Sequence, residues 1–93
     1  MKDMSSVEEK LEKYLGSLGE VLEEVRLREG AAEAHRLLDL ARRYYMDALH
    51  YKDRDPLTAL VCVVYSEGLL DALRFLGLAS FQWPFERRGA RHG

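Results

Sequence analysis

Apolar residues recur along the first third of the chain at alternating steps of four and three residues. They are Val7, Leu11, Tyr14, Leu18, Val21 and Val25. This spacing places them on one side of an α-helix. The pattern loses its phase at Arg28 and Glu29, and Gly30 follows directly. Because glycine commonly stands just beyond the last helical turn, the sequence predicts a first helix over about residues 5–28.

Two further helices are expected. The second covers about residues 31–51, with alanines and large apolar residues sharing its inner face. Asp55 and Pro56 mark the start of a third, because aspartate caps the first amides and proline suits the first helical position. We expect it to end near residue 76, before Gly77. Since short connections make neighbouring helices antiparallel, the sequence predicts an all-α, three-helix up-and-down antiparallel bundle without strands.

The third helix carries apolar residues in nearly every direction around its axis. Two sister helices can cover only part of such a surface, so a partner chain or the aromatic segment 81–85 has to cover the rest. We therefore expect a homodimer in which the third helix or the aromatic segment crosses between subunits. With 93 residues there is room for one core only. Residues 1–85 are assigned to a single domain, and residues 86–93 to a flexible basic tail.

Charge and composition exclude some classes of partner. The net charge is −2, and three arginines among the last eight residues leave the rest of the chain more acidic still. Nucleic acid binding requires a basic face, so none is expected. The apolar run 57–65 is much shorter than the roughly 20 residues that span a bilayer. Glutamates rather than an apolar core follow the first residues, and we expect a cytoplasmic protein without membrane contact.

One polar cluster stands out on the third helix. Glu67, Asp71 and Arg74 are spaced to share one helical face. The simplest interpretation is a structural ion-pair cluster at a helix or subunit seam. Paired carboxylates also serve as acid–base groups or metal ligands, but the Glu-x-x-His pattern of helix-bundle metal sites is absent. We assign no catalytic residue, no metal and no cofactor.

Aromatic residues indicate where an interface would lie. Tyrosine and tryptophan combine an apolar body with a polar tip, which suits them to boundaries between chains as well as to the rim of a core. The candidate interface residues are Tyr45, Asp47, Tyr65, Phe81 and Trp83.

Several strings of residues resemble a known family. They are Tyr44-Tyr45-Met46-Asp47-Ala48, Ala59-Leu60, Tyr65-Ser66-Glu67-Gly68-Leu69-Leu70-Asp71-Ala72-Leu73, Leu76-Gly77 and Phe81-Gln82-Trp83-Pro84. Over roughly residues 40–84 the chain thus resembles the archaeal family catalogued as domain of unknown function 357. The resemblance implies a three-helix up-and-down bundle and carries over no catalytic residue. Some relatives bear this domain beside a nucleotidyltransferase-like domain, which implies an accessory or assembly role.

Two functional hypotheses follow. The favoured one is a non-enzymatic helical interaction module that self-associates and docks a protein partner, accessory to a nucleotidyltransferase-like enzyme. The alternative is a small ligand-binding protein or enzyme that uses Glu67, Asp71 and tyrosines at a subunit seam.

Overall fold

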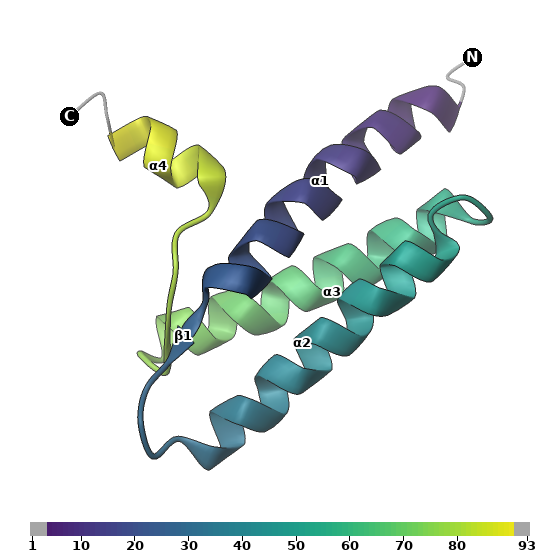
Figure 1. Cartoon of the computed structure of the whole chain (residues 1–93). Coiled ribbons are helices and arrows are strands. Elements are labelled where there is room, and N and C mark those ends of the chain that lie inside the picture. Colours follow the sequence, from purple (N-terminus) through teal and green to yellow (C-terminus); the bar gives the residue numbers. More distant parts are fainter. Residues whose placement is uncertain (1–3, 91–93) are drawn as a thin grey trace.

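Three long helices dominate the computed structural model, which describes residues 4–90. The elements in order are α1 (Met4–Glu24), β1 (Arg26–Leu27), α2 (Ala32–Tyr51), α3 (Pro56–Phe75), β2 (Ala79–Ser80) and α4 (Pro84–Ala90). The long helices alternate in direction along the chain, with α2 beside α3 and α1 packed across the pair (Figure 1). The predicted all-α bundle is confirmed, and helices α2 and α3 lie within one residue of their predicted ends.

Small side chains form the contact between α2 and α3. Ala41 and Ala48 of α2 and Ala59 of α3 are each fully buried. Small residues at such a contact allow two helix axes to approach closely. Ser66 is also fully buried, and its Oγ donates a hydrogen bond to the carbonyl oxygen of Ala41 at 2.8 Å. This bond meets the requirement that a buried hydroxyl find a partner.

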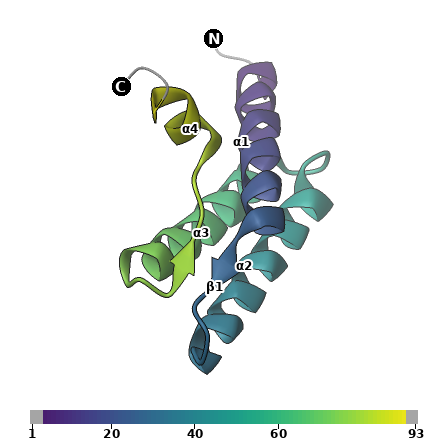
Figure 2. The ribbon, with the colours of Figure 1, turned by 60° about the vertical axis from the view of Figure 1, so that its left-hand side comes forward.

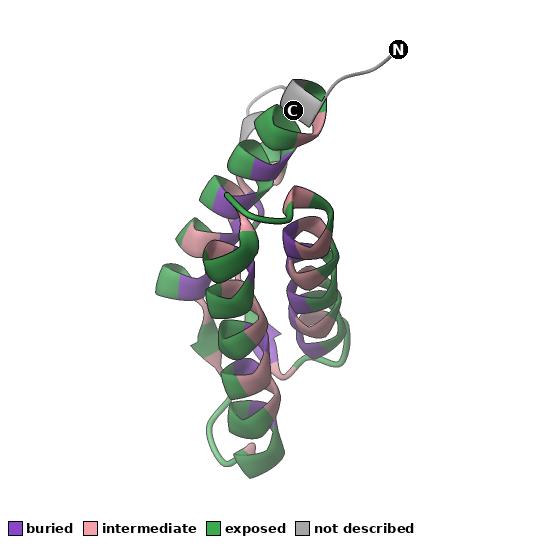
Figure 3. Cartoon of the chain, turned by 90° about the vertical axis from the view of Figure 1, so that its right-hand side faces the viewer, coloured by how far each residue is buried: buried purple, intermediate pink, exposed green. Residues whose placement is uncertain are grey.

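Larger side chains from α1 close the core over this pair. The buried residues of α1 are Leu11, Leu15, Leu18, Val21 and Leu22. They follow the helical spacing that the sequence predicts, and they pack with Val63, Leu70 and Leu73 of α3 in one cluster. Figure 3 shows the buried positions turned towards the space between the helices and the exposed ones turned outward.

Both ends of α3 are capped as the sequence predicts. Asp55 accepts a hydrogen bond from the backbone N–H of Thr58 at 3.2 Å and another from its hydroxyl at 2.6 Å. At the other end Gly77 has a φ of 76°, which favours glycine. Its N–H donates to the Arg74 carbonyl, and that of Leu78 donates to the Leu73 carbonyl. This pair of bonds turns the chain sharply out of the helix.

The expectation of no strands is wrong. Arg26 pairs with Ser80 and Leu27 with Ala79 in a two-stranded antiparallel sheet (Figure 2). Helix α1 accordingly ends at Glu24 rather than near residue 28, because the residues that follow form ladder bonds with a segment far along the chain. Gly30, with a φ of 81°, lies in the turn before α2 and does not cap α1.

The C-terminal segment also differs from the prediction. A flexible tail was expected from residue 86, but residues up to Ala90 form helix α4. Arg87 of α4 reaches Glu20 and Glu24 of α1, with N–O distances of 2.8 and 3.1 Å. Such exposed ion pairs stabilise a fold only modestly, but they give α4 a defined position beside α1. Residues 91–93 of the expected tail lie outside the described residues.

Among the described residues, α3 is the one helix long and apolar enough to cross a membrane. An 18-residue stretch of it has a mean hydropathy of 1.4, and 33% of that stretch is buried in the bundle. A core helix meets the same criterion, because a helix covered on several sides is apolar all round.

Two glycines of α1 provide a matched test of the packing. No atom lies within 4 Å of a Cβ built at Gly16, whereas one built at Gly19 lies 2.7 Å from the Tyr45 hydroxyl oxygen. Gly16→Ala should raise the free energy of unfolding by about 1 kcal/mol through helix propensity alone. Gly19→Ala should lose most of that gain, because Tyr45 has to move. Urea denaturation measures both, and equal gains would contradict the predicted contact.

Candidate functional site

The polar cluster on α3 is tied to the C-terminal segment. Asp71 and Arg74 lie 3.9 Å apart, at the outer limit of an ion pair. The closer partner of Asp71 is Trp83, whose Nε1–H donates to its Oδ1 at 2.9 Å. The closer partner of Arg74 is Glu86. The structure therefore brings the predicted cluster together only loosely and directs two of its three members towards the residues after β2.

Arg74 is the centre of this attachment. Its guanidinium donates two hydrogen bonds to the carboxylate of Glu86, at 2.7 and 3.0 Å, and a third to the carbonyl oxygen of Phe81. It also lies over the Phe81 ring, 4.8 Å from the ring centre. The bidentate geometry is the strongest that an arginine and a carboxylate can adopt. It raises the pKa of Arg74 and lowers that of Glu86, through these hydrogen bonds first.

Glu67 has a different environment. It is half-buried, and no hydrogen bond or ion pair reaches its carboxylate from the described residues. Burial raises the pKa of this carboxyl, and the nearby charge of Asp71 raises it further. A carboxylate in such surroundings destabilises the fold, because it has lost part of its hydration without gaining a partner.

Glu67 and Asp71 lie on the wall of a groove of about 510 Å³ between α1, α3 and the C-terminal segment. Tyr14 contributes from α1, and Trp83 and Phe85 contribute from beyond β2. We call this the α1–α3 groove. It combines two carboxylates with three aromatic rings, a composition that binds organic molecules by packing and orients them by charge.

The five candidate interface residues do not form one surface. Phe81 and Trp83 stack edge to face, with ring centres 5.2 Å apart, and pack on their own chain. Tyr45 faces Gly19 of α1 at the rim of the core. Tyr65 is exposed and stacks on Tyr44, and Asp47 is exposed one helical turn after Tyr44 on α2.

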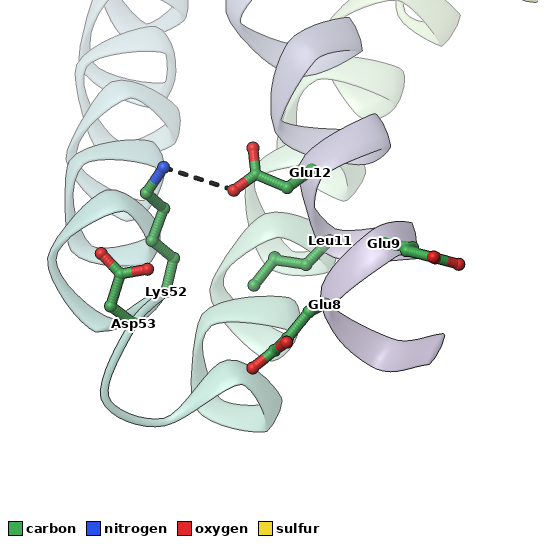
Figure 4. Close-up of a pocket in the computed structure, with 6 residues that line it drawn as sticks. All are labelled: Glu8, Glu9, Leu11, Glu12, Lys52 and Asp53. Atoms are coloured by element: carbon green, nitrogen blue, oxygen red, sulfur yellow. Dashed lines mark hydrogen bonds and ion pairs between the residues drawn. The ribbon is translucent and has the colours of Figure 1, made fainter. Parts of the chain in front are cut away.

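A second hollow lies near the start of α1. It has a volume of about 350 Å³ and is bordered mainly by charged side chains from α1 and the turn after α2 (Figure 4). The Lys52 ammonium points at Glu12, with Nζ and Oε2 3.4 Å apart, while Glu9 points away. The hollow is the gap around an ion pair between two elements. Its carboxylates do not converge on a common point.

The arrangement favours binding over metal chemistry. Within residues 4–90 no group of three or more histidine, cysteine, aspartate or glutamate side chains is placed to hold a metal ion. Cys62 is half-buried, and burial raises the pKa of its thiol, which keeps it in the less reactive protonated form.

Two residues whose hydrogen bonds join separate elements of the fold were not identified from the sequence. Ser66 lies at helical spacing from the buried Val63 and Leu70. Its position within this apolar face is the sequence feature that indicates a buried serine. Glu86 stands three residues after Trp83 and two after Pro84, the spacing at which a carboxylate reaches back to cap a helix start. It does so here, because the Trp83 N–H donates to Glu86 Oε1 at 2.8 Å.

Substituting the two carboxylates should change stability in opposite directions. The folded-state pKa of Glu67 is raised, so ionisation destabilises the fold as pH rises from the unfolded value through the folded one. Glu67→Gln should raise the melting temperature at pH 7, and the gain should disappear below pH 4.5, the ordinary pKa of the group. Asp71→Asn weakens the acceptor of the Trp83 indole and should lower stability by about 1 kcal/mol. Thermal melts at several pH values check both, and a lower melting temperature for Glu67→Gln at pH 7 would show that its carboxylate has a partner.

The comparisons with known proteins complete this description. No curated protein and no solved structure matches the chain. A family model described as a protein of unknown function (DUF357) matches residues 13–79, from the middle of α1 to β2, with every residue of the polar cluster inside the match. Since the match covers well over half of the sequence, the chain belongs to the DUF357 family.

Proposed function

We propose that this protein is a non-enzymatic interaction module that self-associates through the outer face of α3. The outer face comprises Leu57, Val61, Val64, Tyr65, Gly68, Ala72, Phe75 and Leu76, all of them exposed. The six large side chains among them are between 55% and 91% exposed. A continuous apolar face of this kind is uncommon on a monomer and typically marks a contact with another molecule. This face is the observation that carries the proposal.

A second copy of the chain fits this face by shape. The large side chains of Val61 and Val64 lie in its first half, and the small residues Gly68 and Ala72 lie in its second half. An antiparallel pairing of two α3 helices, centred between Val64 and Gly68, sets Val64 of each copy opposite Gly68 of the other and Leu57 opposite Phe75. This is the self-complementarity that a twofold symmetric interface requires. Asp71 at the edge is the one charged side chain on the exposed side of α3, so like charges oppose the pairing very little.

Gly68 supports the same pairing. Glycine within a helix lowers stability by about 1 kcal/mol relative to alanine. No atom lies within 4 Å of a Cβ built there, so packing within the chain gives no reason for a glycine at this position. Close approach of a second helix provides one, because axis separation depends on the side chains at the crossing.

We propose that the same face also docks a protein partner. An accessory role beside a nucleotidyltransferase-like enzyme is part of the same proposal. The accessory role draws its support from the family resemblance alone. The aromatic segment does not take part in the proposed interface, because Phe81 and Trp83 pack against their own chain.

Lysine substitutions on the outer face test the assembly. Wild type is expected to sediment as a dimer at micromolar concentration. Val61→Lys places a charge in the proposed interface of both copies and should weaken the dimer at least about a hundredfold. Met46→Lys is the matched control, since Met46 is exposed to a similar extent on α2 and should leave the dimer unchanged.

Two results would contradict the proposal. One is a wild type that sediments as a monomer at every concentration tested. The other is flotation of the wild type, but not of Val61→Lys, with phospholipid vesicles. In that case the outer face contacts a membrane surface and not a second copy.

A further inference from the structure

The α1–α3 groove contains an acidic side chain, Glu67, that pairs with no other described side chain. Five charged side chains in the described residues are half-buried: Lys52, Glu67, Arg74, Glu86 and Arg87. Four of them form ion pairs with N–O distances between 2.7 and 3.4 Å. Glu67 alone has no such partner, although it lies on the most apolar helix of the chain. Its neighbour Asp71 adds a second negative charge, which does not offset the charge of Glu67.

The groove around Glu67 has the size and the lining of a small-molecule site. Its volume of about 510 Å³ falls within the usual range for ligand pockets. The Trp83 indole is held in place by its hydrogen bond to Asp71, and Tyr14 and Phe85 present partly exposed rings nearby. Aromatic rings beside a carboxylate favour a ligand that carries a positive charge on an apolar body, because the rings attract cations and cover hydrocarbon.

Other occupants fit less well. A metal ion requires more ligands than these two carboxylates, and Asp71 already accepts the indole bond. An anion would meet the negative charges of Glu67 and Asp71. Lys13 is the one basic residue that lines the groove, and it is exposed on the α1 side. Lys13 therefore weakens the attraction for a cation, but it does not by itself create a site for an anion.

We infer that the α1–α3 groove binds a small organic amine, with its ammonium group at Glu67 and Asp71 and its apolar body against Trp83 and Phe85. Binding supplies the positive partner that no described side chain provides for Glu67. The inference is separate from self-association, because the groove is formed within one chain and only Val64 lies both in it and on the outer face of α3.

The test uses 2-phenylethylamine as the probe and the neutral 2-phenylethanol as its isostere. Trp83 is the only tryptophan, so its fluorescence and its indole N–H resonance report on the groove directly. We expect saturable changes with the amine and binding at least about tenfold weaker with the alcohol, as expected for loss of a charged hydrogen bond. Glu67→Gln should weaken amine binding by a similar factor, and Lys13→Ala should leave it unchanged or strengthen it.

Glu33→Gln is the control for overall charge. It removes one negative charge from an exposed position on α2, a helix that contributes no residue to the lining of the groove, and should not alter binding. Thermal melts of each variant confirm that it is folded. A third ligand, Nα-acetyl-lysine methylamide, represents the lysine side chain of a partner protein and should bind more weakly than the aromatic amine.

Any of four results would overturn the inference. These are the absence of a saturable response from Trp83, equal affinity for amine and alcohol, equal effects of Glu67→Gln and Glu33→Gln, and tighter binding of the lysine derivative. The last would assign the groove to a partner's side chain instead of a free amine. A monomeric wild type that still binds the amine would contradict the proposed dimer and leave the groove assignment standing.

Discussion

The hydrogen bond from Ser66 to the Ala41 carbonyl lies midway along the contact between α2 and α3, among side chains that are mostly alanine. The two backbones must be close for a serine side chain to make this bond, and the buried alanines allow that closeness. The pair of helices then presents a shared groove that the leucines of α1 fill. Packing on two sides determines which face of α3 is buried, and by exclusion which face is left to solvent.

The C-terminal segment depends on the same arrangement. Gly77 turns the chain back after α3, and the residues of β2 then pair with β1, the short strand that follows α1. Arg74 then attaches the segment through Glu86 and Phe81, and Asp71 attaches it through Trp83. Two members of the polar cluster on α3 are thereby used within the fold. Among the described side chains none pairs with Glu67, and the groove beside it is where we infer a ligand.

The outer face of α3 and the α1–α3 groove are adjacent surfaces of the same helix. The outer face is apolar and exposed, and Gly68 near its middle leaves room for close approach, so it suits a second helix. The groove is flanked by α1 and the aromatic segment and contains the unpaired carboxylate, so it suits a small charged molecule. The two surfaces therefore favour different partners, although Val64 belongs to both.

The sequence by itself determined the local features: the three helices, the caps at Asp55 and Gly77, and the nomination of Glu67 and Asp71. Periodicity and capping depend on neighbours within a few residues, which a single sequence displays. Only the tertiary structure decided the strand pairing of Arg26 with Ser80, the bond of Arg74 with Glu86, and the isolation of Glu67. Those features depend on which segments meet after the chain folds back. The packing of the three helices decides which segments come into contact. In each of these contacts the two residues lie far apart in the sequence, so no short stretch of residues contains both.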